Sequence, residues 1–373
     1  MYNGNTTGVL GKWPYPPFYW WESGAAWGGM MNYWWYTGDY SWYDVTHEGL
    51  VSQISPTFNY LPIVEMFDEG NDDIGFWVFG AMTAAEMSLR SPPPPYPSWL
   101  QISVNVFKDF AVRWNDASST CGGGLRWQVF ESSPGYHYKN TISNGCFFAL
   151  AARLYRMLGD AIYLQWANAM WDWTVNVGLM NKTTYAVFDG ADEMINCTGK
   201  DHHQWSYNVA VYLQGAAVLS NFTGDPKWKQ RAIGLTAASS LFHTPYANVS
   251  KVIYEQECET KARCNIDQYS FKAYLVRWLS EAAVLVPETR TTVQPVLEAS
   301  AIGAARACTG GGTVDFSLNI CGARWYWSSF DNTAGLGQPL SAMEVFYSLL
   351  VLIHLERVPM LNVAVTNGTG VQE

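Results

Sequence analysis

Two adjacent carboxylates, Asp72 and Asp73, open a strongly apolar segment, GNDDIGFW, at residues 70–77. One aspartate suffices to cap a helix and to interact favourably with its dipole. A second carboxylate beside the first is electrostatically costly, because close like charges raise the pKa of one of them. Cleavage of a glycosidic bond needs such a pair, with one ionised group and one proton donor. The residues alone leave a catalytic pair and a helix cap as equally weighted interpretations.

A glycine-rich group follows in the segments TCGGGLRWQ, residues 120–128, and YKNTISNG, residues 138–145. Three consecutive glycines let a backbone approach a ligand closely, although a plain flexible turn is the alternative. A phosphate-binding loop is excluded, since no G-K-S/T sequence follows and no strand–loop–helix pattern surrounds the glycines. The residues of this group that we predict to contact substrate are Gly123, Gly124, Arg126, Trp127, Lys139, Asn140 and Asn144.

A third polar group lies in the segments FDGA, residues 188–191, and QWSYN, residues 204–208. Its amides and hydroxyls can bind sugar hydroxyls, or they can cap helices. The neighbouring His202 and His203 lack the i,i+4 spacing of a helical metal pair, and no G-x-S-x-G motif indicates a serine hydrolase. Together with residues of the first group, the predicted substrate contacts here are Asn71, Trp77, Asp189, Gln204, Tyr207 and Asn208.

The elements that must position these groups are helices. Segments that are apolar over most of their circumference, and are therefore expected to be buried, alternate with amphipathic segments. A glycine–aspartate step separates the two kinds at Gly38, Gly159 and Gly224, where glycine suits the end of one helix and aspartate the cap of the next. This pattern predicts an all-α fold, an (α/α)6 barrel of six inner and six outer helices. We expect one domain over residues 1–373, with short irregular extensions at both ends.

In such a barrel the starts of the inner helices gather at one end. Free backbone N–H groups and partial positive charge there favour a binding site for polar groups. The proline-rich run at residues 91–97 is interpreted as a connection between helices. Little strand is expected, with residues 122–128 favoured as a short hairpin. The inner helices are predicted to begin near Trp21, Asp72, Ser143, Ser206, Asp267 and Ser341.

Aromatic residues make up 16% of the chain and charged residues only 14%, against a usual charged share of about 25%. Aromatic side chains can fill the core of a helical barrel or stack on the flat face of a sugar ring, and the two uses are compatible. The net charge of −10 disfavours nucleic acid, whose phosphates would be repelled. The most apolar stretch, residues 340–355, is too short and too polar to span a bilayer.

None of the seven cysteines forms a C-x-x-C pair, which disfavours zinc, and we expect no metal or other cofactor. The close pairs Cys258/Cys264 and Cys308/Cys321 are interpreted as disulfide loops, and the odd cysteine as a buried free thiol. Neither end carries a leader or an apolar tail, and we expect both to have been trimmed from a longer precursor. Six N-x-S/T sequons favour the secretory route, at Asn5, Asn181, Asn196, Asn221, Asn248 and Asn367.

The motifs GNDDxGFW, CGGGLRWQ, YKNxISNG, FDGA and QWSYN, in this order, resemble glycoside hydrolase family 76, and in particular its fungal cell-wall branch. The match extends from about Trp20 to Val358, and one departure is Ile74, where the family pattern has a polar residue. The resemblance implies an (α/α)6 barrel and a retaining mechanism. By matching position, Asp72 would be the nucleophile and Asp73 the general acid/base.

For the fungal branch, the resemblance implies a transglycosidase that joins anchored glycoproteins to the cell wall. The donor would be the mannose-containing core of a GPI anchor, and the acceptor a β-glucan. Arg126 and Lys139 would then meet an anchor phosphate, or act as counter-ions to Asp189 or to the aspartate pair. The alternatives are an endo-α-1,6-mannan hydrolase and a non-catalytic glycan-binding wall protein.

The expected location follows from the same resemblance. We expect a secreted monomer at the cell wall or the outer face of the plasma membrane. Its attachment to the membrane would be only through a GPI anchor of the full-length precursor.

Overall fold

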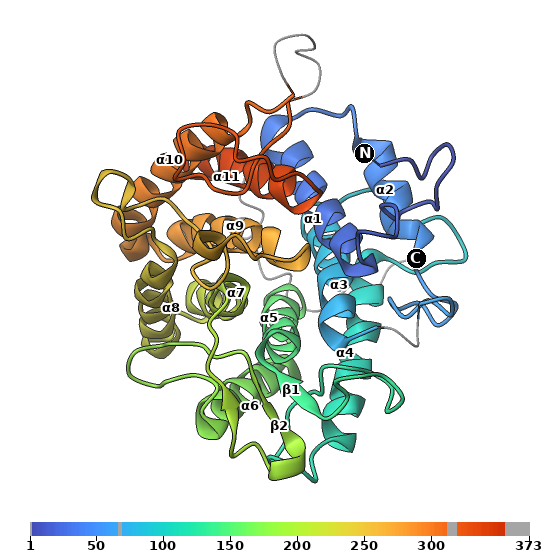
Figure 1. The fold of residues 1–373 in the computed structure, drawn as a ribbon. Coiled ribbons are helices and arrows are strands. Elements are labelled where there is room, and N and C mark those ends of the chain that lie inside the picture. Colours follow the sequence, from blue (N-terminus) through green and yellow to red (C-terminus); the bar gives the residue numbers. More distant parts are fainter. Residues whose placement is uncertain (1, 66–68, 312–318, 355–373) are drawn as a thin grey trace.

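The computed structural model describes residues 2–65, 69–311 and 319–354 (Figure 1). Six helices form an inner ring, in which each helix packs on the next in chain order and the last packs on the first. The ring is therefore closed within the described chain. Its members are α1 (Trp20–Thr37), α3 (Asn71–Glu86), α5 (Thr141–Leu158), α7 (Ser206–Thr223), α9 (Phe271–Leu285) and α11 (Gly337–Ile353).

Outer helices alternate with the inner ones, and each packs on the inner helix that precedes it. They are α2 (Tyr43–Ser52), α4 (Trp99–Asp116), α6 (Ala161–Val177), α8 (Pro226–Ala238) and α10 (Arg290–Ala307). This confirms the predicted (α/α)6 barrel. The described residues contain five outer helices rather than six, because their last segment ends at His354, directly after α11. A sixth outer helix after α11 would lie outside the described residues.

The glycine–aspartate steps form the joints between inner and outer helices, as predicted. Gly38, Gly159 and Gly224 end α1, α5 and α7 with φ angles of 72°, 68° and 69°, a left-handed conformation in which glycine is favoured. Asp160 and Asp225 then accept hydrogen bonds from the first backbone N–H groups of α6 and α8, at 3.0 and 2.8 Å. The joints at Gly159 and Gly224 therefore reverse the chain and cap the next helix, whereas Asp39 accepts the Ser41 N–H and α2 begins without a side-chain cap.

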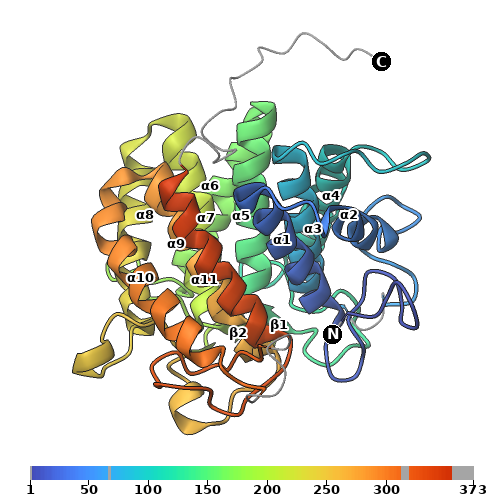
Figure 2. The ribbon, with the colours of Figure 1, turned by 90° about the horizontal axis from the view of Figure 1, so that it is seen from above.

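The short sheet does not lie where the sequence suggested. The strands are β1 (Tyr138–Asn140), β2 (Gly190–Asp192) and β3 (Lys200–Asp201), paired antiparallel in this order. The predicted hairpin at residues 122–128 is wrong, because Gly122, Gly123 and Gly124 all have positive φ and form a loop. The sheet lies at the end of the barrel where the inner helices begin, since β1 runs directly into α5 (Figure 2).

Short 3-10 turns complete the connections: η1 (Glu193–Ile195), η2 (Ser239–Phe242), η3 (Ala247–Val249), η4 (Glu259–Lys261), η5 (Asp267–Tyr269) and η6 (Pro287–Thr289). The proline-rich run lies between α3 and α4, as predicted. Among the described residues, no helix is long and apolar enough to cross a membrane.

Three disulfides hold loops of the barrel. The predicted bridges Cys258–Cys264 and Cys308–Cys321 are confirmed, and a third joins Cys121 to Cys197. The cysteine left over, Cys146, is a buried free thiol, as predicted. Since disulfides form and persist in oxidising compartments, these bridges fit an extracellular protein.

Buried ion pairs join neighbouring inner helices inside the ring. Arg277 of α9 donates to both carboxylate oxygens of Glu344 in α11, and its Nε also lies 3.2 Å from the Tyr347 hydroxyl. Arg153 of α5 pairs with Glu86 of α3 at 2.7 Å. In this apolar interior each charge depends on its partner, because an unpaired buried ion is strongly disfavoured.

We predict that Arg277→Met lowers the free energy of unfolding by about 3–5 kcal/mol, because it leaves Glu344 charged and buried without its partner. The double variant Arg277→Met/Glu344→Leu should recover most of the loss. Denaturant unfolding would measure both effects. Arg90→Ala, which breaks an ion pair with Asp44 at positions that are 50% and 72% exposed, is the control and should cost at most about 1 kcal/mol. Equal losses for Arg277→Met and Arg90→Ala would contradict the prediction.

Candidate active site

The aspartate pair occupies the first turn of α3, where backbone N–H groups are free to bind acceptors. The Gly70 N–H donates to Asp73 Oδ2 at 2.7 Å, and the Asp73 N–H donates to Asp72 Oδ1 at 3.2 Å. The second oxygen of Asp72 accepts a hydrogen bond from Asn140 Nδ2 at 2.9 Å. Both carboxyl groups thus have fixed orientations, and both residues retain partial exposure at the end of the barrel.

The two carboxyl groups differ in their electrostatics. Desolvation raises the pKa of Asp72 to about 7, although the hydrogen bonds from backbone N–H groups and from Asn140 oppose this shift. Desolvation and the charge of Asp72 raise the pKa of Asp73 well above its ordinary value. Asp72 therefore ionises first while Asp73 keeps its proton. An anion and an acid side by side are the two groups that glycosidic cleavage with retention requires.

Asn140 links the sheet, a helix and the aspartate pair. It is the last residue of β1 and the N-cap of α5, where its Oδ1 accepts the Ser143 N–H at 3.3 Å. The other half of the same amide binds Asp72. The amide orientation is thus fixed from both sides beside Asp72, and the contact of Asn140 with substrate stays a prediction.

Glu69 interacts electrostatically with Asp73, and two more carboxylates, Asp189 and Asp267, lie within reach of the pair. Asp189 accepts hydrogen bonds from the Tyr138 hydroxyl at 2.8 Å and from Asn208 Nδ2 at 3.4 Å. Asp267, at the start of η5, accepts a hydrogen bond from Trp21 Nε1 at 3.0 Å. The charge of Asp189 contributes to the raised pKa of Asp72, and that of Asp267 to the raised pKa of Asp73. Asp267 was predicted only as a helix start, and that position was its one signal in the sequence.

Aromatic residues flank the carboxylates. Tyr207 stacks on Phe271 with ring centroids 3.9 Å apart, and burial followed by the charges of Asp189, Asp72 and Asp267 raises its pKa. Trp127 is 36% exposed. A Cβ added to Gly70 would lie 3.0 Å from its indole. Tyr207 and Trp127 therefore lie beside the aspartates, and with the half-buried Gln204 they remain predicted substrate contacts.

Three predicted contacts are wrong, because their side chains are fully buried and already bound within the protein. Trp77 stacks between Trp20 and Tyr60, with ring centroids 4.9 and 5.4 Å away. The Lys139 ammonium donates to the carbonyl oxygens of Ala117, Thr120 and Gly123 at 2.7–2.9 Å. Asn144 binds both the N–H and the carbonyl oxygen of Leu125, at 2.8 and 3.0 Å.

The glycine loop and Asn71 also serve the protein itself. A Cβ on Gly123 would lie 2.8 Å from Trp114, and one on Gly124 would lie 2.1 Å from Trp173. The glycines therefore permit close packing on tryptophan rather than an approach to ligand. Asn71 is 1% exposed and donates to the Arg126 carbonyl at 2.9 Å, so its predicted contact with substrate is also wrong.

Glu193 is the centre of a charged cluster that the sequence did not indicate. Its carboxylate accepts hydrogen bonds from Arg126 Nε at 2.6 Å, His137 Nδ1 at 2.9 Å and Thr120 Oγ1 at 2.7 Å. Lys139 Nζ lies 3.6 Å away. Burial opposes ionisation, but the hydrogen bonds outweigh it and lower the pKa of Glu193 to about 2. Arg126 and Lys139 are thus counter-ions of Glu193, and the predicted pairings with Asp189 or the aspartate pair are wrong.

The floor beneath the aspartates is closely packed. A Cβ added to Gly75 of α3 would lie 2.6 Å from Cys146 Cβ of α5. The thiol of Cys146 has its pKa raised by burial and by the charges of Asp72 and Asp73. The helices α3 and α5 therefore meet at closest approach just below the site. Within the described residues, no three His, Cys, Asp or Glu side chains are grouped so as to hold a metal ion.

The chain matches the model of glycosyl hydrolase family 76 over residues 1–359. It belongs to this family. A family 76 member is a glycoside hydrolase, in agreement with the two carboxyl groups at the start of α3. The chain is 41% identical to mannan endo-1,6-alpha-mannosidase DCW1 of Saccharomyces cerevisiae over 350 residues, which cover 94% of this chain and 75% of that protein.

Solved structures agree with the assignment. Dfg5 from Chaetomium thermophilum, solved in complex with glucosamine, is 38% identical with a TM-score of 0.88, and the match covers 94% of this chain and 87% of that one. The GH76A alpha-1,6-mannanase of Salegentibacter sp. is 18% identical with a TM-score of 0.69, covering 89% and 90% of the two chains. The latter likeness establishes the shared fold alone.

We predict that Asn140→Ser shifts the acid limb of the kcat/KM profile of this family 76 enzyme to higher pH. As the predicted nucleophile, Asp72 acts when ionised, so activity is expected to rise with pH through its pKa. Loss of the amide donor raises that pKa further by removing a hydrogen bond to the charged form, worth about 1.5–3 kcal/mol or about one to two pH units. Serine still caps α5, so thermal unfolding should change little. An unchanged acid limb would show that Asn140 does not tune Asp72.

Proposed function

We propose that this protein is a retaining glycosidase and transglycosidase that acts on α-1,6-mannose-containing glycans. The observation that carries the proposal is the pair of carboxyl groups in the first turn of α3, of which Asp72 alone accepts a hydrogen bond from the Asn140 amide. The names of the relatives support the substrate class, since they are mannan endo-1,6-alpha-mannosidases at about 40% identity. The remaining contacts proposed for substrate are Trp127, Asn140, Asp189, Gln204 and Tyr207. Asn208 is not among them, because its side chain is 0% exposed and its Nδ2 already donates to Asp189.

In the first half-reaction, the Asp72 carboxylate attacks the anomeric carbon and forms a glycosyl ester. The bond from that carbon to the leaving oxygen breaks, and Asp73 gives its proton to this oxygen. In the second half-reaction, Asp73, now ionised, takes a proton from water or from a sugar hydroxyl. The activated oxygen attacks the same carbon and releases Asp72. Water gives hydrolysis, whereas a sugar hydroxyl gives transglycosylation.

The proposed donor is the mannose core of a GPI anchor, and the proposed acceptor is a cell-wall β-glucan. Asp72, Asp73, Asp189 and Asp267 form a group of carboxylates, and no lysine or arginine pairs with any of them among the described residues. An ammonium group is attracted to such a site. The glucosamine bound to Dfg5 of Chaetomium thermophilum supports a ligand that carries an amine.

The proposed setting is the fungal cell wall, reached by secretion and retained through a GPI anchor of the full-length precursor. Three disulfides support the secretory route. The closed helical ring supports a single domain that acts as a monomer, because one chain supplies every helix of the ring and every residue of the site.

The deciding experiment is product analysis by mass spectrometry with an α-1,6-mannose-containing GPI-core glycan, with and without a β-glucan acceptor. We expect a donor–acceptor chimera that disappears in Asp72→Asn and falls by about 10²–10⁴-fold in Asp73→Asn. The exposed Asp116→Asn should behave as wild type. NMR of the new linkage should show the anomeric configuration of the donor. Free mannosides alone would favour an endo-α-1,6-mannan hydrolase, and binding without turnover would favour a wall-binding protein.

The four clustered aspartates predict that the site prefers a ligand that carries an amine. Glucosamine should inhibit mannoside turnover about tenfold more strongly than N-acetylglucosamine, because only the former carries an ammonium. Asp267→Asn should reduce this preference while Asp116→Asn leaves it intact. Equal inhibition by both sugars, at low and at high salt, would contradict a role of these charges in donor binding.

A further inference from the structure

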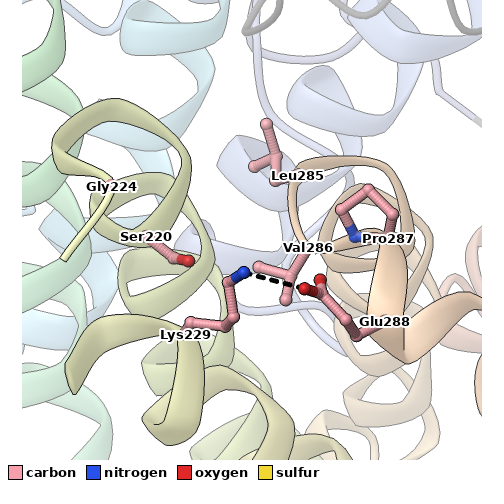
Figure 3. A pocket seen from close by; sticks show the side chains of 7 residues that line it. All are labelled: Ser220, Gly224, Lys229, Leu285, Val286, Pro287 and Glu288. Atoms are coloured by element: carbon pink, nitrogen blue, oxygen red, sulfur yellow. Dashed lines mark hydrogen bonds and ion pairs between the residues drawn. The ribbon is translucent and has the colours of Figure 1, made fainter. Parts of the chain in front are cut away.

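A hollow of about 530 Å³ opens near the ends of two inner helices (Figure 3). Ser220 and Gly224 border it where α7 ends, and Leu285 and Val286 border it where α9 ends. The inner helices run in the same direction, and the aspartate pair lies at the start of α3. The hollow is therefore at the opposite end of the barrel from the catalytic groups and takes no part in their chemistry.

Asn221 stands at the edge of this hollow. It directly follows Ser220 and begins the N-x-T sequon Asn221–Thr223. Its side chain is exposed, and Nδ2 lies 3.5 Å from the carbonyl oxygen of Leu285. N-glycosylation replaces one of the two hydrogens on Nδ2, so the other can still donate to Leu285. The atom that would carry a sugar is thus held beside the hollow.

The surroundings of the hollow suit an N-acetylhexosamine. The exposed Pro287 offers an apolar surface for the face of the ring or the acetyl methyl group, and Leu285 and Val286, which are 3% and 1% exposed, form the apolar base behind it. Lys229 and Glu288 form an ion pair at 2.8 Å across one side, and both remain 48% exposed. Their charges can bind sugar hydroxyls. A Cβ on Gly224 would meet nothing within 4 Å, so the rest of a glycan has an open path to solvent.

We infer that Asn221 carries an N-linked glycan whose first N-acetylglucosamine seats in the hollow between the ends of α7 and α9. The inference rests on the proposed secretory route. Asn181 provides the contrast, because it lies in an exposed turn where its Oδ1 accepts the N–H groups of Thr183 and Thr184. It adjoins no residue of the hollow. A glycan there would extend freely into solvent.

The test is glycopeptide mass spectrometry of the full chain secreted from a fungal host, with an endoglycosidase that cleaves between the two core N-acetylglucosamines. We expect Asn221 to be occupied. Release of its glycan from the native protein should be at least tenfold slower than from the denatured protein, whereas the Asn181 glycan should be released at similar rates from both. An unoccupied Asn221, or equal native and denatured rates at Asn221, would overturn the inference.

Two surface variants test whether the hollow causes the protection. Lys229→Ala/Glu288→Ala removes one side of the hollow and should accelerate native release at Asn221 by several-fold. Arg90→Ala/Asp44→Ala, which removes an ion pair of similar exposure elsewhere, should leave the rate unchanged. Equal effects of the two double variants would contradict the proposed seat. Glycans at the other sequons of the same protein report the secretory route separately, so its failure is distinguishable from an empty Asn221.

Discussion

The desolvation of two adjacent carboxyl groups is the constraint on which the site depends. A partly buried carboxylate is tolerated only when hydrogen bonds replace its water. The first turn of α3 supplies backbone N–H groups, and Asn140 supplies a side-chain amide. Neither source suffices alone, since the helix start serves both aspartates while the amide serves only Asp72. Because Asp72 receives one more hydrogen bond than the helix start alone provides, the two aspartates differ in pKa although their side chains are identical.

The position of Asn140 depends in turn on a buried support that never meets substrate. Lys139 and Asn144, on either side of it in the chain, bind the backbone of residues 117–125. Glu193 then binds Arg126 and Thr120, and the Cys121–Cys197 bridge fastens the same two segments. The conspicuous polar motifs of this sequence therefore act mainly by holding one amide in place. Only part of them can touch a ligand.

The helical periodicity and the glycine–aspartate joints predicted the barrel, because both arise from contacts local in the chain. The inner helices begin within four residues of their predicted starts, and the aspartate pair lies where the pattern placed it. Contacts between side chains that are distant in the sequence could not be predicted from it. Glu193 lies outside the periodic helical segments, so no sequence pattern marks it. The burial of Lys139 depends on the loop of residues 117–123, which is distant from it in the chain. Trp77 was predicted as a substrate contact within the motif that opens α3, yet one helical turn, about 6 Å along the axis from Asp73, places its side chain in the core.

The contact between Gly75 and Cys146 has a consequence for how such an enzyme can diversify. With no space between α3 and α5 below the aspartates, a larger side chain at either position would displace the helix that carries both aspartates. Changes in sugar specificity are therefore expected in the connecting segments at the start of each inner helix, where insertions do not move the helix axes. The packing of α3 on α5 therefore stays constant, and changes in the connecting segments can alter which sugar binds without moving the aspartate pair.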